Sequence, residues 1–402
     1  MMVVASERIR FGLAAPVRVQ AAGSIADATQ TQLFAEILTA GPLSRTELAR
    51  RADLSQSTVT KVVNPLIEAG YVVEVGAKSS GMGRPHRLLR VAADRYAVIG
   101  VKIAPGSVTG VLADLEARVL AHRTRPLTAG HDPAEALDAA VAVVRELVDD
   151  PTAHGEVLGL GVGLGGHVDT ASGRVAHSGV LGWDNVQVAE PLAAATGLPT
   201  VVDNDVNALA IAERWFGAGR DIDSFVLVTT GPGVGCGLLL GGQLYAGSTG
   251  LAGELGHIPL QANGVVCDCG NRGCLETVAS DRAVLREIAA HGGSITDIGE
   301  AITAARSGDE RALAAFETMG TALGLGLATV CNLFNPQRIV LTGERASAYD
   351  LFGSACEKSW REHAFSTAAQ DCELVVDEAD DLMWARGAGC LVIREAVGAS
   401  VG

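Results

Sequence analysis

The segment GHIPLQANGVVCDCGNRGCLE, from Gly256 to Glu276, holds one histidine followed by three closely spaced cysteines, with glycines between them. Its candidate ligands are His257, Cys267, Cys269 and Cys274. One imidazole and three thiolates, with no position left open, are typical of a structural tetrahedral Zn²⁺ site. The intervening glycines let the chain turn tightly around an ion. The sequence therefore predicts a zinc-binding segment over residues 254–276, and the alternative is a group of buried thiols without metal.

The length and composition of the chain limit the class of protein. It has 402 residues, of which 48% are hydrophobic and 19% are charged. This is too long for one ordinary core, so we expect two or three domains of α/β type. We see no apolar run near the roughly 18 residues of a membrane helix and no signal peptide. We therefore expect a cytoplasmic protein with no membrane partner, whose other cysteines are buried thiols and not disulfides: Cys236, Cys331, Cys356, Cys372 and Cys390.

Charge is distributed unevenly along the chain. The net charge is −15, but residues 31–90 contain eight Lys and Arg against five Asp and Glu. This segment therefore carries +3, and the rest of the chain carries −18. A basic N-terminal domain on an acidic body indicates two different tasks, and a basic domain is the usual electrostatic footprint of nucleic-acid binding.

Two short capped helices are predicted after Leu43. Ser44 and Glu47 form a capping box for the first helix, which we expect to end near Ala52, and Ser55 caps the second. The apolar residues of the second helix recur at helical spacing, which leaves small polar side chains facing outward: Gln56, Ser57, Thr58, Thr60 and Lys61. This arrangement is typical of a helix-turn-helix, in which such side chains bond phosphates and base edges in a major groove.

Residues 71–91 read as a strand, a loop and a strand, which is the shape of a wing. The loop holds Arg84 between glycine and proline, with Arg87 close behind. An arginine in such surroundings is held extended, as in the arms that enter a minor groove. We therefore predict that Arg84 and Arg87 contact DNA.

Pro65 interrupts the pattern of the second helix. It removes one helical hydrogen bond, so we expect a kink or an early end near Lys61. Together with the wing, the pattern predicts a flexible extension over residues 1–27 and a winged helix-turn-helix DNA-binding domain over residues 28–92. The alternative is a winged helix that serves only for protein contacts.

The body, residues 93–402, is predicted to consist of two similar α/β lobes. Residues 96–126 read as three strands, and they precede an amphipathic helix and a buried strand that enters a glycine turn. Residues 224–247 repeat the order of strand, glycine-rich turn and strand about 130 residues further along. Two such openings predict two halves with a cleft between them.

Four polar residues follow an apolar strand and precede a helix that we expect to start near Ala208: Asp203, Asn204, Asp205 and Asn207. Polar groups at the carboxyl end of a strand commonly line a ligand site. Asp205 can act as a general base toward a hydroxyl, or simply accept its hydrogen bond. Helix capping explains one of the four residues but not all of them, so a ligand site is the favoured interpretation.

Several of these motifs, with GELGH at 253–257 and NLFNPQRIVLTG at 332–343, resemble those of the ROK family, named for repressors, open reading frames and kinases. The resemblance runs from about Gln30 to about Ala396. It implies a two-lobed, actin-like body of the sugar-kinase (ribonuclease H-like) type behind a winged helix-turn-helix, and the wing sequence GMGRP is similar to that of the family's repressors. It also implies sugar contacts at Asn204, Asp205, Glu254, His257 and Glu276, with Asp205 at the position of the kinases' catalytic base.

The sequence departs from the family's kinases where those kinases bind ATP. Their DxGGT loop is replaced by VKIAPGSV, in which Lys102 stands for the aspartate and Pro105 for a glycine. The carboxylate that would organise Mg²⁺ is lost, and Pro105 has no N–H to offer a phosphate. The second phosphate turn contains Pro232, and Val180 replaces an asparagine that is usual at the sugar site. We therefore expect one hydrogen bond to the sugar to be missing.

Three functions are consistent with these patterns. The first is a sugar-responsive DNA-binding transcriptional regulator of carbohydrate metabolism, expected to be a repressor, which binds operator DNA as a homodimer or tetramer and senses a sugar or sugar phosphate. It is no enzyme, and its cofactor is structural Zn²⁺. The second is a sugar kinase with an appended DNA-binding domain, against which the altered ATP loop argues. The third is a regulator that senses no sugar and is controlled by a partner protein, and its main support is Val180.

Overall fold

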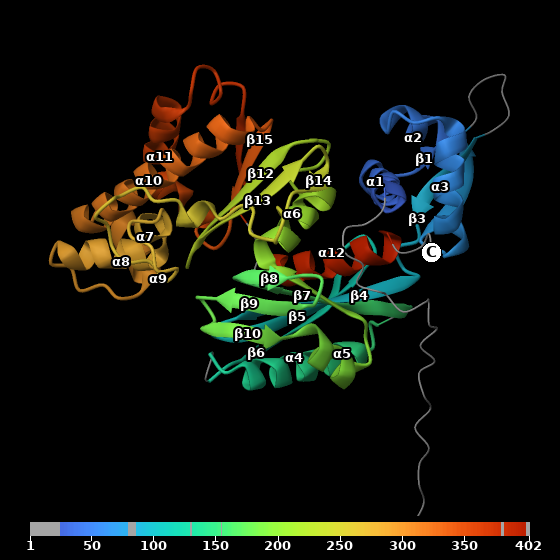
Figure 1. The fold of residues 1–402 in the computed structure, drawn as a ribbon, viewed down its shortest axis with the longest axis horizontal. Coiled ribbons are helices and arrows are strands. Elements are labelled where there is room, and N and C mark those ends of the chain that lie inside the picture. The colour runs from blue at the N-terminus through green and yellow to red at the C-terminus, as the bar shows by residue number, and fades with distance from the viewer. Residues whose placement is uncertain (1–24, 79–85, 129–130, 154, 379–381, 399–402) are drawn as a thin grey trace, which may run out of the picture.

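The computed structural model describes residues 25–78, 86–128, 131–153, 155–378 and 382–398. Most of the predicted extension, residues 1–24, lies outside the described residues, as does the wing loop 79–85 with Arg84. Figure 1 shows a small N-terminal head beside a body of two lobes.

The head contains three helices and a three-stranded antiparallel sheet with strand order β1-β3-β2. The helices are α1 (Ile25–Ala40), α2 (Arg45–Arg51) and α3 (Gln56–Glu68), and the strands are β1 (Leu43–Ser44), β2 (Val72–Lys78) and β3 (His86–Val91). Ser44 and Glu47 form the predicted capping box on α2, and Ser55 accepts the Thr58 N–H at the start of α3. Both predicted caps are confirmed, and each satisfies backbone N–H groups that have no partner within their helix.

Pro65 does not shorten α3, so an early end near Lys61 is wrong, and the kink expected as the alternative stays a prediction. The helix continues past Pro65 to Glu68. Val63 and Leu66 lie on either side of the proline and are fully buried in the core of the head. This packing holds the last turn of α3 in place although the proline cannot donate a backbone hydrogen bond.

The first lobe is built on a five-stranded sheet with strand order β11-β7-β4-β5-β6. Its strands are β4 (Tyr96–Ala104), β5 (Ser107–Asp114), β6 (Val119–Pro126), β7 (Glu156–Leu164) and β11 (Thr200–Asn204). The first three form an antiparallel meander, and β7 and β11 add to β4 in parallel. Helices and a small antiparallel sheet complete the lobe: α4 (Pro133–Val148), α5 (Ala189–Thr196), β8 (His167–Asp169), β9 (Arg174–Ser178) and β10 (Trp183–Gln187).

The second lobe repeats this plan with strand order β14-β13-β12-β15-β16. Its strands are β12 (Phe225–Thr230), β13 (Val234–Leu240), β14 (Gln243–Leu244), β15 (Arg338–Thr342) and β16 (Glu373–Val376). Again three strands are antiparallel and two are added in parallel, which confirms the predicted pair of similar halves. The helices of this lobe are α7 (Glu276–Ala279), α8 (Asp281–Ala290), α9 (Ile298–Arg306), α10 (Glu310–Phe334) and α11 (Tyr349–His363), with 3-10 turns at η1 (Leu255–His257) and η2 (Ala346–Ala348).

Two helices, α6 (Asp205–Phe216) and α12 (Met383–Gly398), lie between these parts (Figure 1). α12 rests directly on the first sheet, because a Cβ on Gly161 would lie 1.8 Å from the Ala388 carbonyl oxygen. Its first residue, Met383, packs with core residues of the second sheet. Near its other end, the Val397 carbonyl accepts a hydrogen bond of 2.9 Å from the buried Gln30 side chain of α1. α12 therefore contacts both lobes and the head.

Helix α10 is long and apolar enough, by length and composition, to cross a membrane. Of its most apolar window, 61% is buried inside the protein. Phe316, Leu323 and Leu327 are fully buried there, in the core of the second lobe. The sequence reading missed this apolar stretch, which the structure accounts for as the central helix of a lobe core.

Candidate functional site

Asn204 joins the end of β11, the start of α6 and the glycine turn after β7. Its side-chain oxygen accepts the N–H groups of Val206 and Asn207 at 2.9 and 3.3 Å. Its amide nitrogen donates to the Gly166 carbonyl at 3.0 Å. Because Asn204 is the N-cap, α6 begins at Asp205, earlier than the predicted start near residue 208.

Asp203 and Asn207 are buried and bond to each other. The Asn207 amide donates to Asp203 Oδ1 at 3.2 Å, and the backbone N–H of Asn204 donates to the same oxygen at 2.7 Å. Burial raises the pKa of the Asp203 carboxyl, and the nearby Arg394 opposes this shift. Asp203, Asn204 and Asn207 are thus engaged in local hydrogen bonds. Asp205 Oδ2 has its partner elsewhere in the chain.

That partner is Lys102, the residue that replaces the aspartate of the kinase loop. Lys102 Nζ contacts Asp205 Oδ2, and the two side chains are only 17% and 10% exposed. The Lys102 ammonium also lies 4.8 Å from the centre of the Trp384 ring on α12, a cation–π contact. The other oxygen of Asp205 accepts the Val206 N–H at 2.9 Å. The carboxylate at the kinases' base position is therefore held in an ion pair.

Glu344 lies beside this ion pair, just after β15. A Cβ on Gly231 would lie 2.4 Å from Glu344 Oε2, so the carboxylate rests against the glycine turn. The surrounding protein raises the pKa of the Glu344 carboxyl through desolvation, while Lys102 opposes the shift and Asp205 adds to it. We call Lys102, Glu344 and the turn 231–233 the phosphate side, because they stand at the phosphate loops of the related kinases.

The arginine that follows, Arg345, is also engaged. Its Nε and Nη2 atoms donate to the two oxygens of Asp281 at 2.6 and 2.8 Å. The two side chains are 18% and 12% exposed. A bidentate pair of this kind is strong and directional, and the third guanidinium nitrogen, Nη1, donates to the Glu344 carbonyl at 3.0 Å.

The remaining predicted sugar contacts come from the segment after β14 and from the start of α7. Glu254 Oε2 is 3.8 Å from His257 Nε2, and Glu276 Oε2 accepts the Val234 N–H at 3.1 Å. Burial raises the pKa of the Glu254 carboxyl, which His257 and His167 lower and Glu276 raises further. We call the five predicted contacts the sugar side: Asn204, Asp205, Glu254, His257 and Glu276. The turn 231–233 separates the two sides, since Gly231 approaches Glu344 and Gly233 approaches Glu276.

Two contacts join the lobes next to the sugar side. His167 Nε2 lies 2.9 Å from the Thr249 carbonyl oxygen. A Cβ on Gly179 would lie 3.6 Å from the Asp268 side chain, in the cysteine-rich segment. Val180 is 46% exposed and lies against Gly165. An apolar side chain therefore occupies the place where the resemblance to the family implied an asparagine.

The four predicted metal ligands lie together. The ligand atoms of His257, Cys267, Cys269 and Cys274 all lie within 4.8 Å of one another. Cys267 Sγ is 3.6 Å from His257 Nδ1, and Cys269 Sγ is 3.7 Å from Cys274 Sγ. These are the edge lengths of a tetrahedron around an ion with bonds of about 2.0–2.3 Å. The cluster can therefore hold a metal ion, and His257 turns its other nitrogen toward Glu254.

The other cysteines are free and buried, which confirms the prediction. Burial raises the pKa of Cys236, Cys356 and Cys390 to about 12 in each case. They are therefore neutral thiols at physiological pH, and neutral thiols are poor nucleophiles and poor metal ligands. Cys331 accepts a hydrogen bond of 3.2 Å from the Trp360 indole.

The predicted DNA-contacting residues of α3 lie at its surface. Gln56, Ser57 and Lys61 are exposed, and Thr58 and Thr60 are half-buried. Several of these side chains have local partners, since Thr60 donates to the Gln56 carbonyl at 2.8 Å. The Ser57 and Thr58 hydroxyls each lie 2.8 Å from the Ser55 hydroxyl. Lys61 thus presents a positive charge on the outer face of the helix.

The wing strand β3 carries the predicted contact Arg87. Its guanidinium pairs with Glu74 at 2.6 Å, and Glu74 also pairs with Arg45 of α2 at 2.7 Å. The Arg87 side chain is still 73% exposed. One carboxylate between two arginines leaves a net positive charge where the wing meets α2. Arg84 lies outside the described residues.

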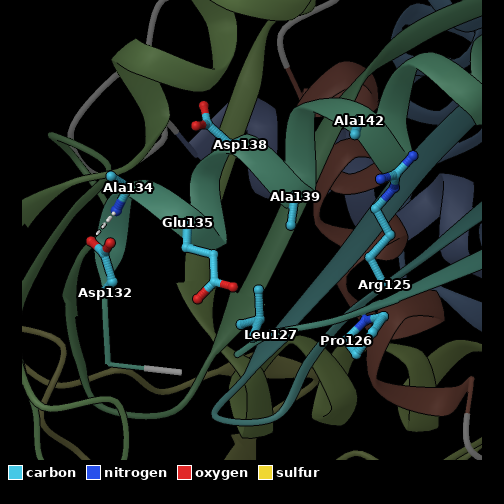
Figure 2. Close-up of a pocket in the computed structure, with 9 residues that line it drawn as sticks. All are labelled: Arg125, Pro126, Leu127, Asp132, Ala134, Glu135, Asp138, Ala139 and Ala142. Atoms are coloured by element: carbon cyan, nitrogen blue, oxygen red, sulfur yellow. Dashed lines mark hydrogen bonds between the residues drawn. The ribbon is translucent and has the colours of Figure 1, made fainter. Parts of the chain in front are cut away.

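Two hollows in the described part of the chain lie away from both the sugar side and the phosphate side. The larger one, about 680 Å³, lies between the end of β6 and the start of α4 (Figure 2). Its polar groups serve local structure, because Asp132 caps α4 through the Ala134 N–H and Glu135 accepts the Thr128 N–H at 2.8 Å. The smaller one, about 470 Å³, lies beside α11 and β16. No residue of the sugar side or the phosphate side lines either hollow.

A winged-helix head on a two-lobed body with paired α/β sheets defines a DNA-binding protein of the sugar-kinase fold class. Residues 98–395 match the ROK family, and residues 27–81 match the MarR family. The chain therefore belongs to the ROK family, as its motifs predicted.

Its relatives include regulators and kinases. The chain is 32% identical over 365 residues to the DNA-binding transcriptional dual regulator NagC of Escherichia coli strain K12, covering 88% of this chain and 89% of that protein. It is 28% identical over 366 residues to the xylose repressor of Bacillus subtilis strain 168, and the match covers 90% of this chain and 94% of that protein.

Solved structures show the same pattern. A ROK family transcriptional regulator that is a homologue of the E. coli Mlc protein superposes with a TM-score of 0.78 at 29% identity, covering 94% of this chain and 98% of that one. The ROK family glucokinase of Streptomyces griseus, in complex with glucose and AMPPNP, superposes with a TM-score of 0.66 at 27% identity. It covers 73% of this chain and 98% of its own, so the kinase matches the body of this protein and the regulator matches nearly all of it.

Sequence reasoning missed four residues that the structure brings to this region: His167, Glu344, Arg345 and Trp384. A signal for Glu344 and Arg345 was present, because both follow the apolar strand RIVLT directly, as Asp203 follows its own strand. Trp384 carried no such signal, since its role depends on how α12 packs across the chain onto Lys102.

Proposed function

We propose that this protein is a sugar-responsive transcriptional regulator that represses genes of carbohydrate metabolism. Its relatives named xylose repressor and NagC, and the regulator that superposes on nearly the whole chain, support this function. The head supplies a winged helix with an exposed basic residue, Lys61, on the outer face of α3. The body supplies a sugar side whose acids and imidazole suit the hydroxyls of a sugar.

One observation carries the proposal: a single helix contacts both the candidate sugar site and the head. Trp384, near the start of α12, lies on Lys102, which pairs with Asp205 of the sugar side. Val397, near its end, bonds Gln30 of the head. The helix has 16 residues and is therefore about 24 Å long. A sugar bound beside the Lys102–Asp205 pair can thus bias the position of the head through one rigid element, α12.

The kinase alternative finds little support in the geometry. Lys102 holds the carboxylate that would serve as base, and Glu344 brings a second negative charge to the place of the ATP phosphates. A general base has to be free to accept a proton from the substrate hydroxyl. The third function, a regulator without a sugar, is favoured by the exposed Val180 and is an outcome of the experiment below.

We propose that the His257 and cysteine cluster holds one structural Zn²⁺ per chain. Three thiolates and one imidazole are ligands that zinc prefers, and four of them leave no place for a reactive water. The ion would orient His257, and with it Glu254, toward the sugar. It supplies no chemistry of its own to the ligand.

Assembly and location complete the proposal. A single winged helix reads few base pairs, so the protein is expected to bind a roughly palindromic operator as a homodimer or tetramer. It acts in the cytoplasm, where DNA and reducing conditions for its free thiols are found. We place the domain boundaries at residues 28–92 for the DNA-binding domain and 93–402 for the sensor body.

The test is selection of DNA from a random pool by the full chain, repeated in the presence of xylose, glucose or N-acetylglucosamine. We expect a palindromic site to be enriched, and one of the sugars to suppress that enrichment. No enriched sequence would contradict a DNA-binding function. An enriched sequence that no sugar affects, in a chain that also ignores sugars in calorimetry, would favour control by a partner protein.

A further inference from the structure

The surroundings of Asp205 bear on which form of a sugar the site accepts. An ionised carboxylate is only an acceptor, so it can bond a sugar hydroxyl but not an oxygen that carries a phosphate in place of its hydrogen. One Asp205 oxygen accepts the Val206 N–H and the other contacts Lys102. Its remaining lone pairs can accept a hydrogen bond from a sugar hydroxyl. A phosphate in place of the hydrogen of that hydroxyl would lie on the phosphate side.

The cations near this position are already neutralised. Lys102 is paired with Asp205, and Glu344 lies close enough to feel the charges of both. The other face of the Lys102 ammonium is covered by the Trp384 ring. Arg345 donates from Nε and Nη2 to the two oxygens of Asp281 and from Nη1 to the Glu344 carbonyl. A phosphate placed here would therefore meet two carboxylates, Asp205 and Glu344, against one shared ammonium.

Backbone N–H groups, the usual alternative for binding a phosphate, are also engaged. In the second phosphate turn the Gly231 N–H donates to the Gly233 carbonyl at 3.1 Å, and Pro232 has no N–H. The Val234 N–H donates to Glu276 at 3.1 Å, and the Gly235 N–H to the Thr229 hydroxyl at 3.2 Å. The N–H groups of Gly231, Val234 and Gly235 at this turn are thus already bonded within the protein.

We propose that this site selects an unphosphorylated sugar and rejects the same sugar phosphorylated at the hydroxyl next to Asp205, with Glu344 as the residue that enforces the choice. This inference rests on the proposed function and narrows its effector from a sugar or sugar phosphate to the free sugar. Lys102 fixes Asp205 as an acceptor, and Glu344 repels the dianion. The effector is therefore a sugar that reaches the protein before any kinase has acted on it.

The experiment is calorimetric titration of the full chain with two matched pairs of probes, glucose and glucose 6-phosphate and N-acetylglucosamine and its 6-phosphate, and with free xylose. We expect one free sugar to bind, and its phosphate to bind at least about a hundredfold more weakly, because two nearby carboxylates each oppose the dianion. In Glu344→Gln the free sugar should bind with unchanged affinity. The ratio of the Kd of the sugar phosphate to the Kd of the free sugar should fall by about tenfold.

Glu362→Gln is the matched control, since it removes the same charge from an exposed position in the last turn of α11 and should leave the ratio unchanged. A sugar phosphate that binds more tightly than its free sugar would overturn the proposal, and would mean that Lys102 leaves Asp205 to bind the phosphate. An unchanged ratio of the two Kd values in Glu344→Gln would show that Glu344 does not cause the rejection of the sugar phosphate. If neither form of any sugar binds while operator DNA still does, the sugar-sensing function itself fails, which is a different result from loss of discrimination.

Discussion

The sugar side and the phosphate side of this protein lie on two flanks of one glycine turn, yet they have different characters. On the sugar side, Glu254, His257 and Glu276 surround a region that remains partly exposed. On the phosphate side, Lys102 is paired, Glu344 lies on Gly231, and the backbone of the turn bonds to itself. The S. griseus glucokinase, whose structure holds both glucose and a nucleotide, superposes on the same body.

The difference shows how a kinase fold can serve as a receptor. The lobes, the paired sheets and the acids predicted to bind hydroxyls suit recognition of a sugar, and they require no phosphate chemistry. Filling the phosphate side with an ion pair replaces a substrate site by a fixed internal contact. That contact includes Trp384 of α12, and α12 leads to the DNA-binding head. The phosphate side is therefore one end of a structural connection that runs along α12 to the head.

The largest effect is expected from removing one ligand of the proposed metal site beside the sugar side. Cys269→Ser should lower bound zinc from one ion per chain to none and abolish sugar binding, because His257 and Glu254 then lose their fixed positions. Metal analysis of protein purified without chelators measures the first effect and calorimetry the second. Cys356→Ala, which removes a buried thiol elsewhere, should leave the zinc content at one. Wild-type protein without zinc would refute the metal site.

Removing single acceptors on the sugar side should have the next largest effect. A hydrogen bond to a charged group contributes about 1.5–3 kcal/mol, so Asp205→Asn and Glu276→Gln should each weaken sugar binding by about one to two powers of ten. If both side chains bind one ligand, the double variant should lose less than the sum of the two effects. Calorimetry of the four proteins measures this coupling. Fully additive losses would indicate that the two residues do not share a ligand.

The connection through α12 can be weakened without touching either site. Gln30→Ala leaves the buried Val397 carbonyl without its partner, which costs about 1–3 kcal/mol in the contact between head and body. We expect sugar binding and DNA binding each to persist. The factor by which sugar lowers DNA affinity should be several-fold smaller than in the wild type. Gln32→Ala, an exposed change on the same helix, is the control. An identical response to sugar in Gln30→Ala would exclude this contact as the link.

The head should behave as a DNA-binding surface whatever the body does. Lys61→Ala removes one exposed charge from α3, so DNA affinity should fall by a similar factor for all sequences and the salt dependence should weaken by about one phosphate contact. Arg84→Ala should instead relax the preference for A·T pairs beside each half-site. Fluorescence anisotropy at several salt concentrations separates the two effects. An unchanged salt slope in Lys61→Ala would place α3 away from the phosphates.

The smallest effect concerns a residue that we assign to structure and not to ligand binding. Burial raises the folded-state pKa of Asp203 above its unfolded value, so ionisation destabilises the fold as pH rises through that range. Asp203→Asn keeps an acceptor for the Asn204 N–H and should be slightly more stable than the wild type at neutral pH. This advantage should vanish in acid, where Asp203 is protonated in both states. Urea unfolding at two pH values measures it, and a less stable variant at neutral pH would contradict the assignment.

The sequence predicted the parts of the fold that depend on local chemistry. The caps at Ser44 and Ser55, the two strand–turn–strand openings and the grouping of His257 with three cysteines follow from residue type and spacing, and the structure contains them. Pro65 was misjudged because core packing outweighed the loss of one hydrogen bond. The pairing of Lys102 with Asp205 and Trp384 was not predictable, because it joins positions separated by 103 and 282 residues through tertiary packing.

The central claim is that a free sugar acts through Asp205 on a DNA-binding head. Its most direct test is fluorescence anisotropy of the enriched operator DNA, titrated with the sugar that binds, for the wild type and for Asp205→Asn. We predict that sugar releases DNA from the wild type, that Asp205→Asn retains its sugar-free DNA affinity but needs about ten to a hundred times more sugar for release, and that neither protein forms sugar phosphate when ATP is added. Formation of sugar phosphate by the wild type, abolished in Asp205→Asn, would contradict this account and identify the protein as a kinase.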